Sequence, residues 1–284
     1  MITVNVYGGL GNQMFQYAFG RSIAIKKGEE LNIDVVLFDK YDLRDFLLNR
    51  FNINAKQKTL HKCIVSKRYL RKLFQITCLK FKIEIPIYFE KKEFSFDKRV
   101  YLSNANYFYG YWQSYLYFDS IRNVLLNDFK LTNCLDEINT NFLCKIVREN
   151  SVSLHIRRGD YVSADFSKKG HGLCPISYYN TAIQFITDKL IQPTFYIFSD
   201  DINWVKDNLV IPFQTVFIDN NNNYPERDIE LMKNCKHNII ANSTFSWWGA
   251  WLNENPNKIV IAPKKWMNNL NMPIELIPKN WIMI

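Results

Sequence analysis

Short apolar runs alternate with longer amphipathic segments along most of the chain, and glycines or polar residues separate them. The chain opens with a β-rich run at residues 2–7, three glycines, and a segment of helical periodicity at 14–24. A second β-rich run follows at 31–38. Strand, tight turn, helix and strand is the order of a parallel βαβ unit, so the N-terminal part predicts a parallel sheet.

The same alternation returns in the C-terminal half with a clearer period. Apolar runs predict strands at 151–156, 194–199, 215–218, 237–241 and 259–262. Helical periodicity predicts helices at 121–129, 136–147, 175–190, 201–209, 228–234 and 245–253. Such alternation predicts an α/β fold with helices on both faces of a parallel sheet. A length of 284 residues suits two domains, for which we predict residues 1–147 and 148–284.

Two stretches of the N-terminal half depart from this pattern. Residues 101–117 are dense in Tyr, Phe and Trp and have no clear period. Residues 46–83 hold ten Lys or Arg and no acidic residue, so the rest of the chain sums to 9 − 10 = −1. Apolar positions at helical spacing predict an amphipathic basic helix there. An anionic membrane surface, an anionic acceptor, nucleic acid or plain solvent would each suit that helix.

The cysteines and the N-terminus bear on the compartment. None of the six cysteines forms a C-x-x-C pair or has zinc-ligand spacing, so we expect reduced thiols and no metal site. No charged leader precedes an apolar run at the N-terminus, and no run of 18 apolar residues exists. We therefore expect a cytoplasmic protein. The basic stretch leaves open a peripheral position at the inner face of the cell membrane.

Polar motifs follow several predicted strands, at the carboxyl ends where open α/β sheets bind ligands. The first is Gly8-Gly9-Leu10-Gly11-Asn12-Gln13. It is not a dinucleotide fingerprint, because Met14 occupies the place of a small residue, and no G-K-[ST] makes it a Walker loop. Glycines before a helix N-terminus suit phosphate or sugar binding. A tight strand–helix turn is the structural alternative.

The second motif, at 155–160, ends a strand with adjacent arginines. Alternation along the strand places His155 and Arg157 on one face. An arginine fork binds a pyrophosphate through two parallel hydrogen bonds. Two arginines here need either an anionic ligand or carboxylate partners such as Asp160.

Two further motifs follow later strands. Asp200 and Asp201 come directly after residues 194–199, and we interpret one of the two as a cap for the next helix rather than as a metal ligand. Residues 242–251, Asn-Ser-Thr-Phe-Ser-Trp-Trp-Gly-Ala-Trp, lie between a strand and a helix. Hydroxyls and backbone N–H groups gathered at a helix N-terminus predict a phosphate site.

In this order and spacing, the segments GGLGNQMFQYA, HIRRGDY, FSDD and NSTFSWWGAWL resemble the motif set of glycosyltransferase family 11, the α-1,2-fucosyltransferases. The resemblance implies a GT-B-like fold of two Rossmann-type domains facing a cleft. It implies GDP-fucose as donor, inversion at the sugar carbon, no required metal or other cofactor, and a role in surface polysaccharide synthesis. The acceptor would be a galactose-containing oligosaccharide, fucosylated on the 2-hydroxyl.

The resemblance also implies residue roles. His155 and Asp228 resemble guanine contacts, and Arg157 resembles the ligand of the β-phosphate. Arg158 and Asp160 resemble supports for that arginine. The remaining donor-site candidates are Asn12, Gln13, Ser243, Thr244 and Ser246. Arg157, Asp160 and Asn12 are the catalytic candidates.

Three points stay open at this stage. A base for the acceptor hydroxyl is not identified, although Asp160, Asp165 and His171 are candidates by position. Residues 1–147 would form the acceptor side, with acceptor choice in the unmatched region that includes 107–117. Another GDP-sugar as donor, a nucleic-acid or membrane-surface module, and an inactive GDP-binding relative are alternatives. We expect no nucleic-acid partner, because that module would leave Arg157 and Arg158 unexplained.

Overall fold

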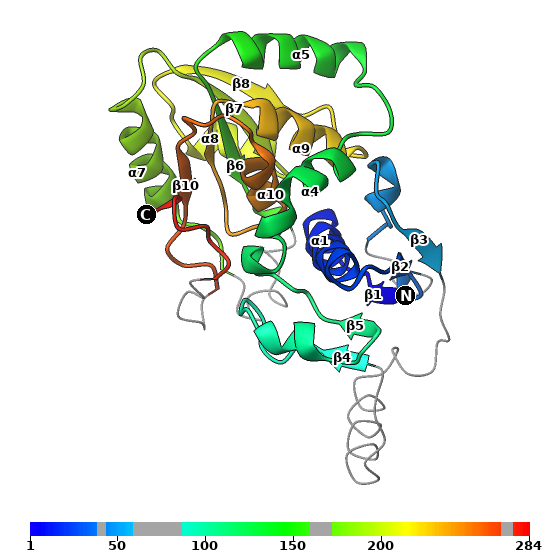
Figure 1. Ribbon diagram of the computed structural model, residues 1–284. Helices are drawn as coiled ribbons and strands as arrows, with labels where there is room; N and C mark the ends of the chain where they lie inside the picture. The colour runs from blue at the N-terminus through cyan, green and yellow to red at the C-terminus, as the bar shows by residue number, and fades with distance from the viewer. Residues whose placement is uncertain (39–43, 59–86, 160–171, 268–274) are drawn as a thin grey trace. The chain divides into compact units, whose positions relative to one another are not determined.

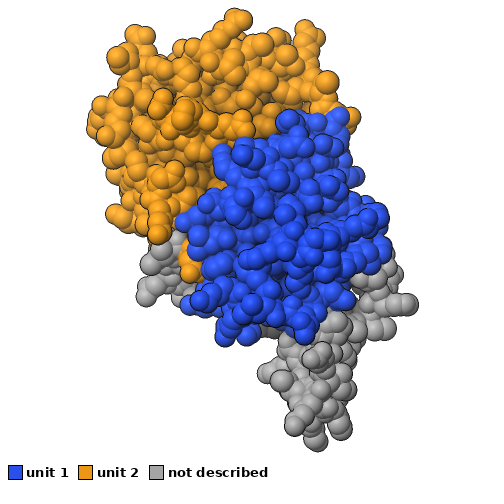
Figure 2. All heavy atoms as spheres, in the orientation of Figure 1, with its two compact units in different colours: residues 1–132 blue, residues 133–284 orange. Residues whose placement is uncertain are grey.

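The computed structural model describes residues 1–38, 44–58, 87–159, 172–267 and 275–284 (Figure 1). The chain forms two compact units, Met1–Thr132 and Asn133–Ile284, which Figure 2 colours separately. This boundary lies before helix α5 (Glu137–Arg148), whereas the sequence analysis placed it after that helix. The reason is packing, because α5 contacts α9 (Pro225–Asn234) and β6 (Ser151–Ile156) of the second unit.

The first unit is built on a five-stranded parallel sheet of order β3-β2-β1-β5-β4. The strands are β1 (Ile2–Asn5), β2 (Leu31–Asp34), β3 (Lys56–Lys58), β4 (Ile87–Phe89) and β5 (Tyr107–Tyr109). Helix α1 (Leu10–Lys27) packs on β1 and β2. Gly20 permits this approach, because an added Cβ would come within 2.8 Å of a Val4 methyl and 2.9 Å of a Leu31 methyl.

The aromatic stretch 101–117 supplies a strand and much of this unit's core. The short 3-10 helix η3 (Lys98–Leu102) ends within it, and β5 and η4 (Tyr115–Tyr117) lie inside it. The elements η5 (Asp119–Ile121) and α4 (Arg122–Asp128) follow. Trp112 is fully buried and stacks on Phe19 of α1 with ring centroids 3.9 Å apart. These aromatics are therefore largely core residues.

The basic stretch is described only in part. Residues 48–50 form η2 (Leu48–Arg50), and the helix predicted for this region is wrong at Lys56–Lys58, which pair with β2 as an edge strand. Lysines are common on edge strands, where they oppose pairing with another chain. The remaining residues, 59–86, lie outside the described part of the chain, so the amphipathic helix stays a prediction there.

The second unit carries a six-stranded parallel sheet of order β11-β10-β9-β6-β7-β8. Its further strands are β7 (Thr194–Ser199), β8 (Gln214–Ile218), β9 (His237–Ile239), β10 (Val260–Ala262) and β11 (Ile282–Met283). Helices α7 (Ile176–Thr187), α8 (Ile202–Asn208), α9 and α10 (Thr244–Leu252) alternate with them. The predicted strands and helices are confirmed here apart from their exact ends, and β11 is an addition. Every residue of β6 is buried, as expected for a central parallel strand.

The strand order gives each sheet a point where successive connections leave in opposite directions. In the first sheet it lies between β1 and β5, and in the second between β6 and β9. Open parallel sheets bind ligands at the carboxyl ends of strands flanking such a point. The glycine motif follows β1, the arginine motif follows β6, and the Asn-Ser-Thr motif follows β9. The topology thus brings three of the motifs to the two switch points.

Among the described residues, no helix is both long and apolar enough to cross a membrane. The thiols of Cys134, Cys144, Cys174 and Cys235 are unpaired.

Candidate active site

The two arginines after β6 are held by carboxylates from the neighbouring strand. Strand register pairs Ile156 with Ser199, so the residues that follow lie side by side. Arg157 Nη1 lies 2.7 Å from Asp200 Oδ2, and Arg158 Nε lies 3.1 Å from Asp201 Oδ2. Asp160, the carboxylate partner predicted from the sequence, lies outside the described residues, as do Asp165 and His171.

Arg158 has the geometry of a support. Its guanidinium carbon lies 3.6 Å from the centre of the Trp204 ring, and its backbone N–H donates to Asp200 Oδ1 over 2.9 Å. Asp201 accepts the backbone N–H of Trp204 and so caps α8, which confirms the interpretation as a helix cap. Arg158 therefore links the ends of β6 and β7.

Arg157 remains partly accessible at this edge. Its side chain keeps 24% of its surface exposed, and the ion pair with Asp200 fixes the direction of the guanidinium. Gly159 makes the close approach possible, because a Cβ there would lie 2.3 Å from Asp200 Oδ2. A fixed, partly exposed guanidinium is suited to bidentate binding of a phosphate.

His155 is buried beside this arginine. Its ring lies 5.6 Å from that of Phe245, and Nδ1 has no hydrogen-bond partner in the described structure. Burial, with a smaller effect of the Arg157 charge, lowers the pKa of His155 to about 3. The imidazole is therefore neutral at physiological pH. A buried nitrogen without a partner at a ligand-binding edge is a candidate ligand contact.

Three hydroxyl residues begin α10, directly after β9. Ser243 Oγ accepts the N–H of Phe245 and caps the helix. Ser246 Oγ donates to the Ser243 carbonyl, and its side chain is buried. Thr244 is the more exposed of the three. The positive end of the α10 dipole lies here, which favours an anionic group.

Asp228 lies in the first turn of α9, the helix that follows β8. Burial raises the pKa of its carboxyl to about 7; a hydrogen bond from Asn221 lowers it, and the charge of Glu226 adds to the rise. Asn221 Nδ2 donates to Asp228 Oδ1 over 2.8 Å. Sequence reasoning missed Asn221, which lies in a run of asparagines without a distinctive pattern.

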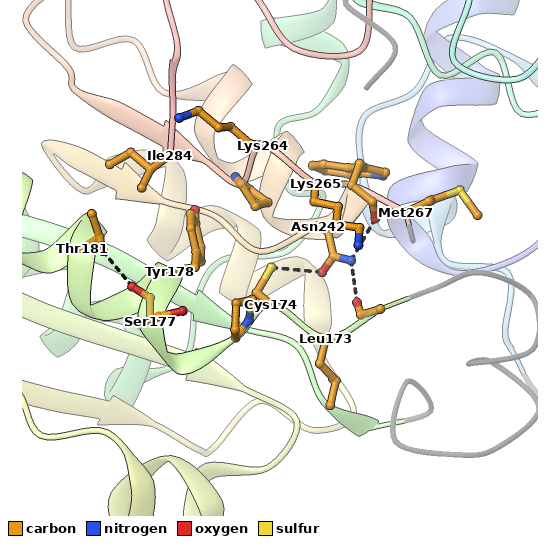
Figure 3. A pocket seen from close by; sticks show the side chains of 14 residues that line it. Leu173, Cys174, Ser177, Tyr178, Thr181, Asn242, Lys264, Lys265, Met267 and Ile284 are labelled. Carbon is orange, nitrogen blue, oxygen red and sulfur yellow. Dashed lines mark hydrogen bonds between the residues drawn. The ribbon is translucent and has the colours of Figure 1, made fainter. Parts of the chain in front are cut away.

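Asn242 is a second residue that the sequence analysis left without a role. Its side-chain amide donates to the carbonyls of Gly172 and Trp266, over 2.7 and 2.9 Å, and accepts from the Cys174 thiol (Figure 3). It thereby fixes two loops next to the α10 N-terminus. Asn242 also borders a cavity of about 340 Å³ against α7 that Lys264 and Lys265 line. His155, Arg157 and Ser243 do not line this cavity, so it is separate from the arginine edge.

The glycine motif of the first unit forms a tight turn, and two amide side chains follow it in the first turn of α1. Gly8 has a φ of +82°, which favours glycine. Asn12 Oδ1 accepts from Gln113 Nε2 over 2.8 Å, so the start of α1 is tied to the segment that follows β5. Gln13 is fully buried; its amide donates to the carbonyls of Gly8 and Asp45 and accepts the N–H of Leu47. Gln13 thus holds backbone in place.

A carboxylate and three tyrosines gather at the same edge. Glu90, directly after β4, accepts the backbone N–H groups of Tyr111 and Trp112 over 2.6 and 3.1 Å. Burial raises its pKa to about 7, against the effect of those two hydrogen bonds. Tyr7 stacks on Tyr109, with centroids 5.5 Å apart, and also contacts Tyr111. All four side chains are half-buried, and aromatic surface of this kind suits the apolar face of a sugar.

The described residues contain no cluster of three His, Cys, Asp or Glu side chains that could hold a metal ion.

Comparison with known proteins finds relatives that align over nearly the full length of the chain. The chain is 34% identical over 297 residues to an alpha-1,2-colitosyltransferase of Escherichia coli, covering 100% of this chain and 99% of that protein. It is 35% identical over 300 residues to the O-antigen biosynthesis glycosyltransferase WbnK of Escherichia coli, covering 97% of each. The galactoside 2-alpha-L-fucosyltransferase SEC1 of Bos taurus is 29% identical over 150 residues, which are 50% of this chain and 41% of that protein.

Solved structures confirm the predicted GT-B-like α/β class. POFUT1 in complex with GDP aligns with a TM-score of 0.51 over 92% of this chain and 97% of its own, at 10% identity. The fucosyltransferase NodZ from Bradyrhizobium aligns with a TM-score of 0.50 over 87% and 92%, at 11% identity. Residues 1–284 match the family described as glycosyl transferase family 11, and with two relatives at about a third identity over nearly the full length, the chain belongs to that family of glycosyltransferases.

Proposed function

We propose that this chain transfers L-fucose from GDP-fucose, with inversion, to the 2-hydroxyl of a terminal galactose in a surface glycan such as an O-antigen. Family membership supports the reaction class, and the names of the relatives supply the sugar, the linkage and the O-antigen context. The observation that carries the proposal is the partly exposed Arg157, fixed by Asp200 at a switch point beside the α10 N-terminus.

The transfer needs stabilisation of a leaving group. The bond between the anomeric carbon and the β-phosphate oxygen breaks, and its electron pair departs with GDP. The acceptor oxygen attacks from the opposite face and loses its proton. Negative charge grows on the diphosphate, and in our proposal Arg157 and the α10 N-terminus stabilise it without a metal ion. One preorganised donor of this kind lowers a barrier by on the order of 3 kcal/mol.

The remaining roles follow the same assignment. The neutral imidazole of His155 and the carboxyl group of Asp228 contact the guanine. Thr244 supplies a hydroxyl that binds a phosphate, and Ser243 and Ser246 shape the turn. Arg158 supports the end of β6 through Asp201 and Trp204. Asn12, held by Gln113, is assigned to the transferred sugar, and Gln13 positions its loop.

Another deoxysugar is a second candidate for the transferred group. The relative that aligns over the whole chain is named a colitosyltransferase. Colitose is fucose without the 3-hydroxyl, so the same diphosphate site would serve both donors. A contact to that hydroxyl is what would separate them. Parallel rates with GDP-fucose and GDP-colitose decide between the two sugars.

The direct test is release of GDP from GDP-fucose with lactose as acceptor and EDTA present. GDP together with a fucosylated trisaccharide, whose linkage NMR identifies, supports the donor, the linkage and the absence of a metal requirement. Activity that appears only after a divalent ion is added back contradicts the metal-independent mechanism. Turnover of GDP-colitose alone transfers the proposal to the second sugar.

A further inference from the structure

Two buried asparagines form a reciprocal amide pair in the second unit. Asn139 Nδ2 donates to Asn221 Oδ1 over 2.9 Å, and Asn221 Nδ2 donates to Asn139 Oδ1 over 2.8 Å. Asn139 is in α5 and has 0% of its surface exposed; Asn221 is in the loop after β8 and has 3% exposed. Burial of two amides is costly unless each satisfies the other, so the pair fixes the loop against α5.

The pair is anchored at one end and reaches Asp228 at the other. Asp136 caps α5 and accepts the backbone N–H and the side-chain amide of Asn139, over 2.9 and 2.8 Å. Arg227 forms an ion pair with the second oxygen of Asp136. At the other end, Asn221 donates to Asp228 Oδ1. The chain of contacts therefore runs from the start of α5 to the first turn of α9.

The two oxygens of Asp228 are in different situations. Oδ1 is fixed by Asn221 over 2.8 Å, whereas no protein donor among the described residues reaches Oδ2. The side chain retains some exposure at the start of α9. One oxygen is thus held by the protein, and the other is available to a ligand at this edge of the sheet.

The charges around Asp228 lie on α9 and on α5, which pack against each other. On α9 itself, Glu226 adds negative charge and Arg227 is paired with Asp136 of α5. Helix α10, which packs on α9, contributes no charged residue between Thr244 and Leu252. Burial and Glu226 favour the protonated carboxyl, and Asn221 is the group that favours the ionised one.

We propose that the Asn139–Asn221 pair is a positioning device for guanine selectivity, which fixes Asp228 Oδ1 so that Oδ2 accepts hydrogen bonds from the donor's guanine. This inference rests on the proposed function, in which Asp228 contacts that base. Guanine presents the N1–H and the 2-amino group as neighbouring donors, and an ionised carboxylate accepts both. Adenine presents an acceptor at N1, which would face the carboxylate without a proton.

Calorimetric titration of the full chain with GDP, between about pH 5.5 and 8.5, tests the device. The variants are Asn221→Asp, which keeps the shape but cannot donate to Asp228, and Asn221→Ser, which adds no charge. Asn222→Ala, an exposed neighbour in the same loop, is the matched control. IDP, which lacks the 2-amino group, and ADP are titrated beside GDP, and thermal melts of each variant monitor folding.

The wild-type protein should lose GDP affinity as the pH falls through about 7. Asn221→Asp should bind GDP about tenfold more weakly at neutral pH and lose it at a higher pH, with a smaller preference for GDP over IDP. Asn221→Ser should change in the same direction, and Asn222→Ala should match the wild type. A merely structural pair would leave the pH midpoint in place.

Two results would overturn the inference, and only the second would also overturn the proposed function. Folded Asn221 variants with the wild-type affinity, midpoint and GDP-to-IDP ratio would overturn the positioning role while leaving the proposed function intact. Absence of GDP binding by the wild type at every pH would overturn the proposed function as well.

Discussion

At the switch point of the second sheet the side chains are cationic or donate hydrogen bonds, whereas at that of the first sheet they are aromatic, amide-bearing or acidic. Arg157 and the α10 N-terminus represent the second unit. Glu90 and Tyr7 represent the first. Both sheets are parallel and both place these groups at carboxyl ends, so the fold does not account for the difference. The residues after the strands, rather than the architecture, therefore set the chemistry of each edge, and our proposal assigns the anionic nucleotide to the second unit and the neutral acceptor sugar to the first.

The largest effect on the rate of transfer should come from removing the guanidinium of Arg157. Arg157→Ala should lower transfer by about 10²–10³-fold, because it removes a donor aimed at the leaving diphosphate. Asp200 keeps its bond from the Arg158 N–H and is partly exposed, so the fold should tolerate the change. Initial rates of GDP release together with a thermal melt check this. Full turnover with an unchanged melt would remove Arg157 from the mechanism.

Next in size is the buried carboxylate of α9. Asp228→Asn should weaken GDP binding by about tenfold or more, because a neutral amide is a weaker acceptor than a carboxylate for the N1–H and 2-amino groups of guanine. Stability should change in the opposite direction. With a folded-state pKa of about 7, the stability that the carboxyl contributes is full below its unfolded pKa and is lost as the pH rises through 7.

Asp228→Asn should therefore raise the melting temperature at pH 8 by roughly 2–4 °C and have less effect near pH 5. Melts at both pH values, with and without GDP, separate the two consequences. A lower melting temperature at pH 8 would contradict the cost assigned to the buried charge.

In the first unit, the corresponding test is Glu90→Gln. We expect the acceptor KM to rise by about tenfold while GDP affinity is unchanged, because Glu90 lies among the tyrosines at the switch point of the first sheet. The glutamine keeps one carbonyl oxygen for the two N–H groups of Tyr111 and Trp112, so stability should fall by about 1 kcal/mol. Steady-state kinetics with varied lactose measures the acceptor KM. Weaker GDP binding by this variant would contradict the assignment of acceptor and nucleotide to different units.

The smallest effect belongs to a single hydroxyl. Thr244→Ala should raise the donor KM by roughly threefold to tenfold, because it removes a neutral hydrogen bond and keeps the helix N-terminus. Ser246→Ala is the matched comparison, since that buried hydroxyl bonds to the Ser243 carbonyl and should affect stability rather than donor binding. Equal donor KM values for the two variants would show that the helix backbone alone binds the phosphate.

The positions of the motifs in the two units could largely be predicted from the sequence. The contacts that the sequence did not predict were missed for physical reasons. The arginine and Asn-Ser-Thr motifs follow long apolar strands, so their place at a sheet edge could be derived. The partners of the arginines could not, because Asp200 and Asp201 meet them through the register of β6 and β7. The short strands β3 and β4 carry too few residues to show a period.

Contacts between segments far apart in the sequence also could not be predicted from hydrophobic periodicity or motifs. Asn139 and Asn221 are 82 positions apart, and neither stands in a motif. Helix α5 shows a clear amphipathic period, but its period does not say which unit its apolar face packs against. The ends of the strands thus predict where the candidate site residues lie, whereas the residues that hold them in place are determined by tertiary packing.

Hydrogen–deuterium exchange of the full chain, with and without GDP, tests the division between the two units most directly. Added GDP should slow exchange at residues 155–159, 221–228 and 242–246, and should leave residues 107–113 of the first unit unchanged. Protection confined to the first unit, or absent from the arginine and α10 segments, would contradict the assignment of the nucleotide to the second sheet.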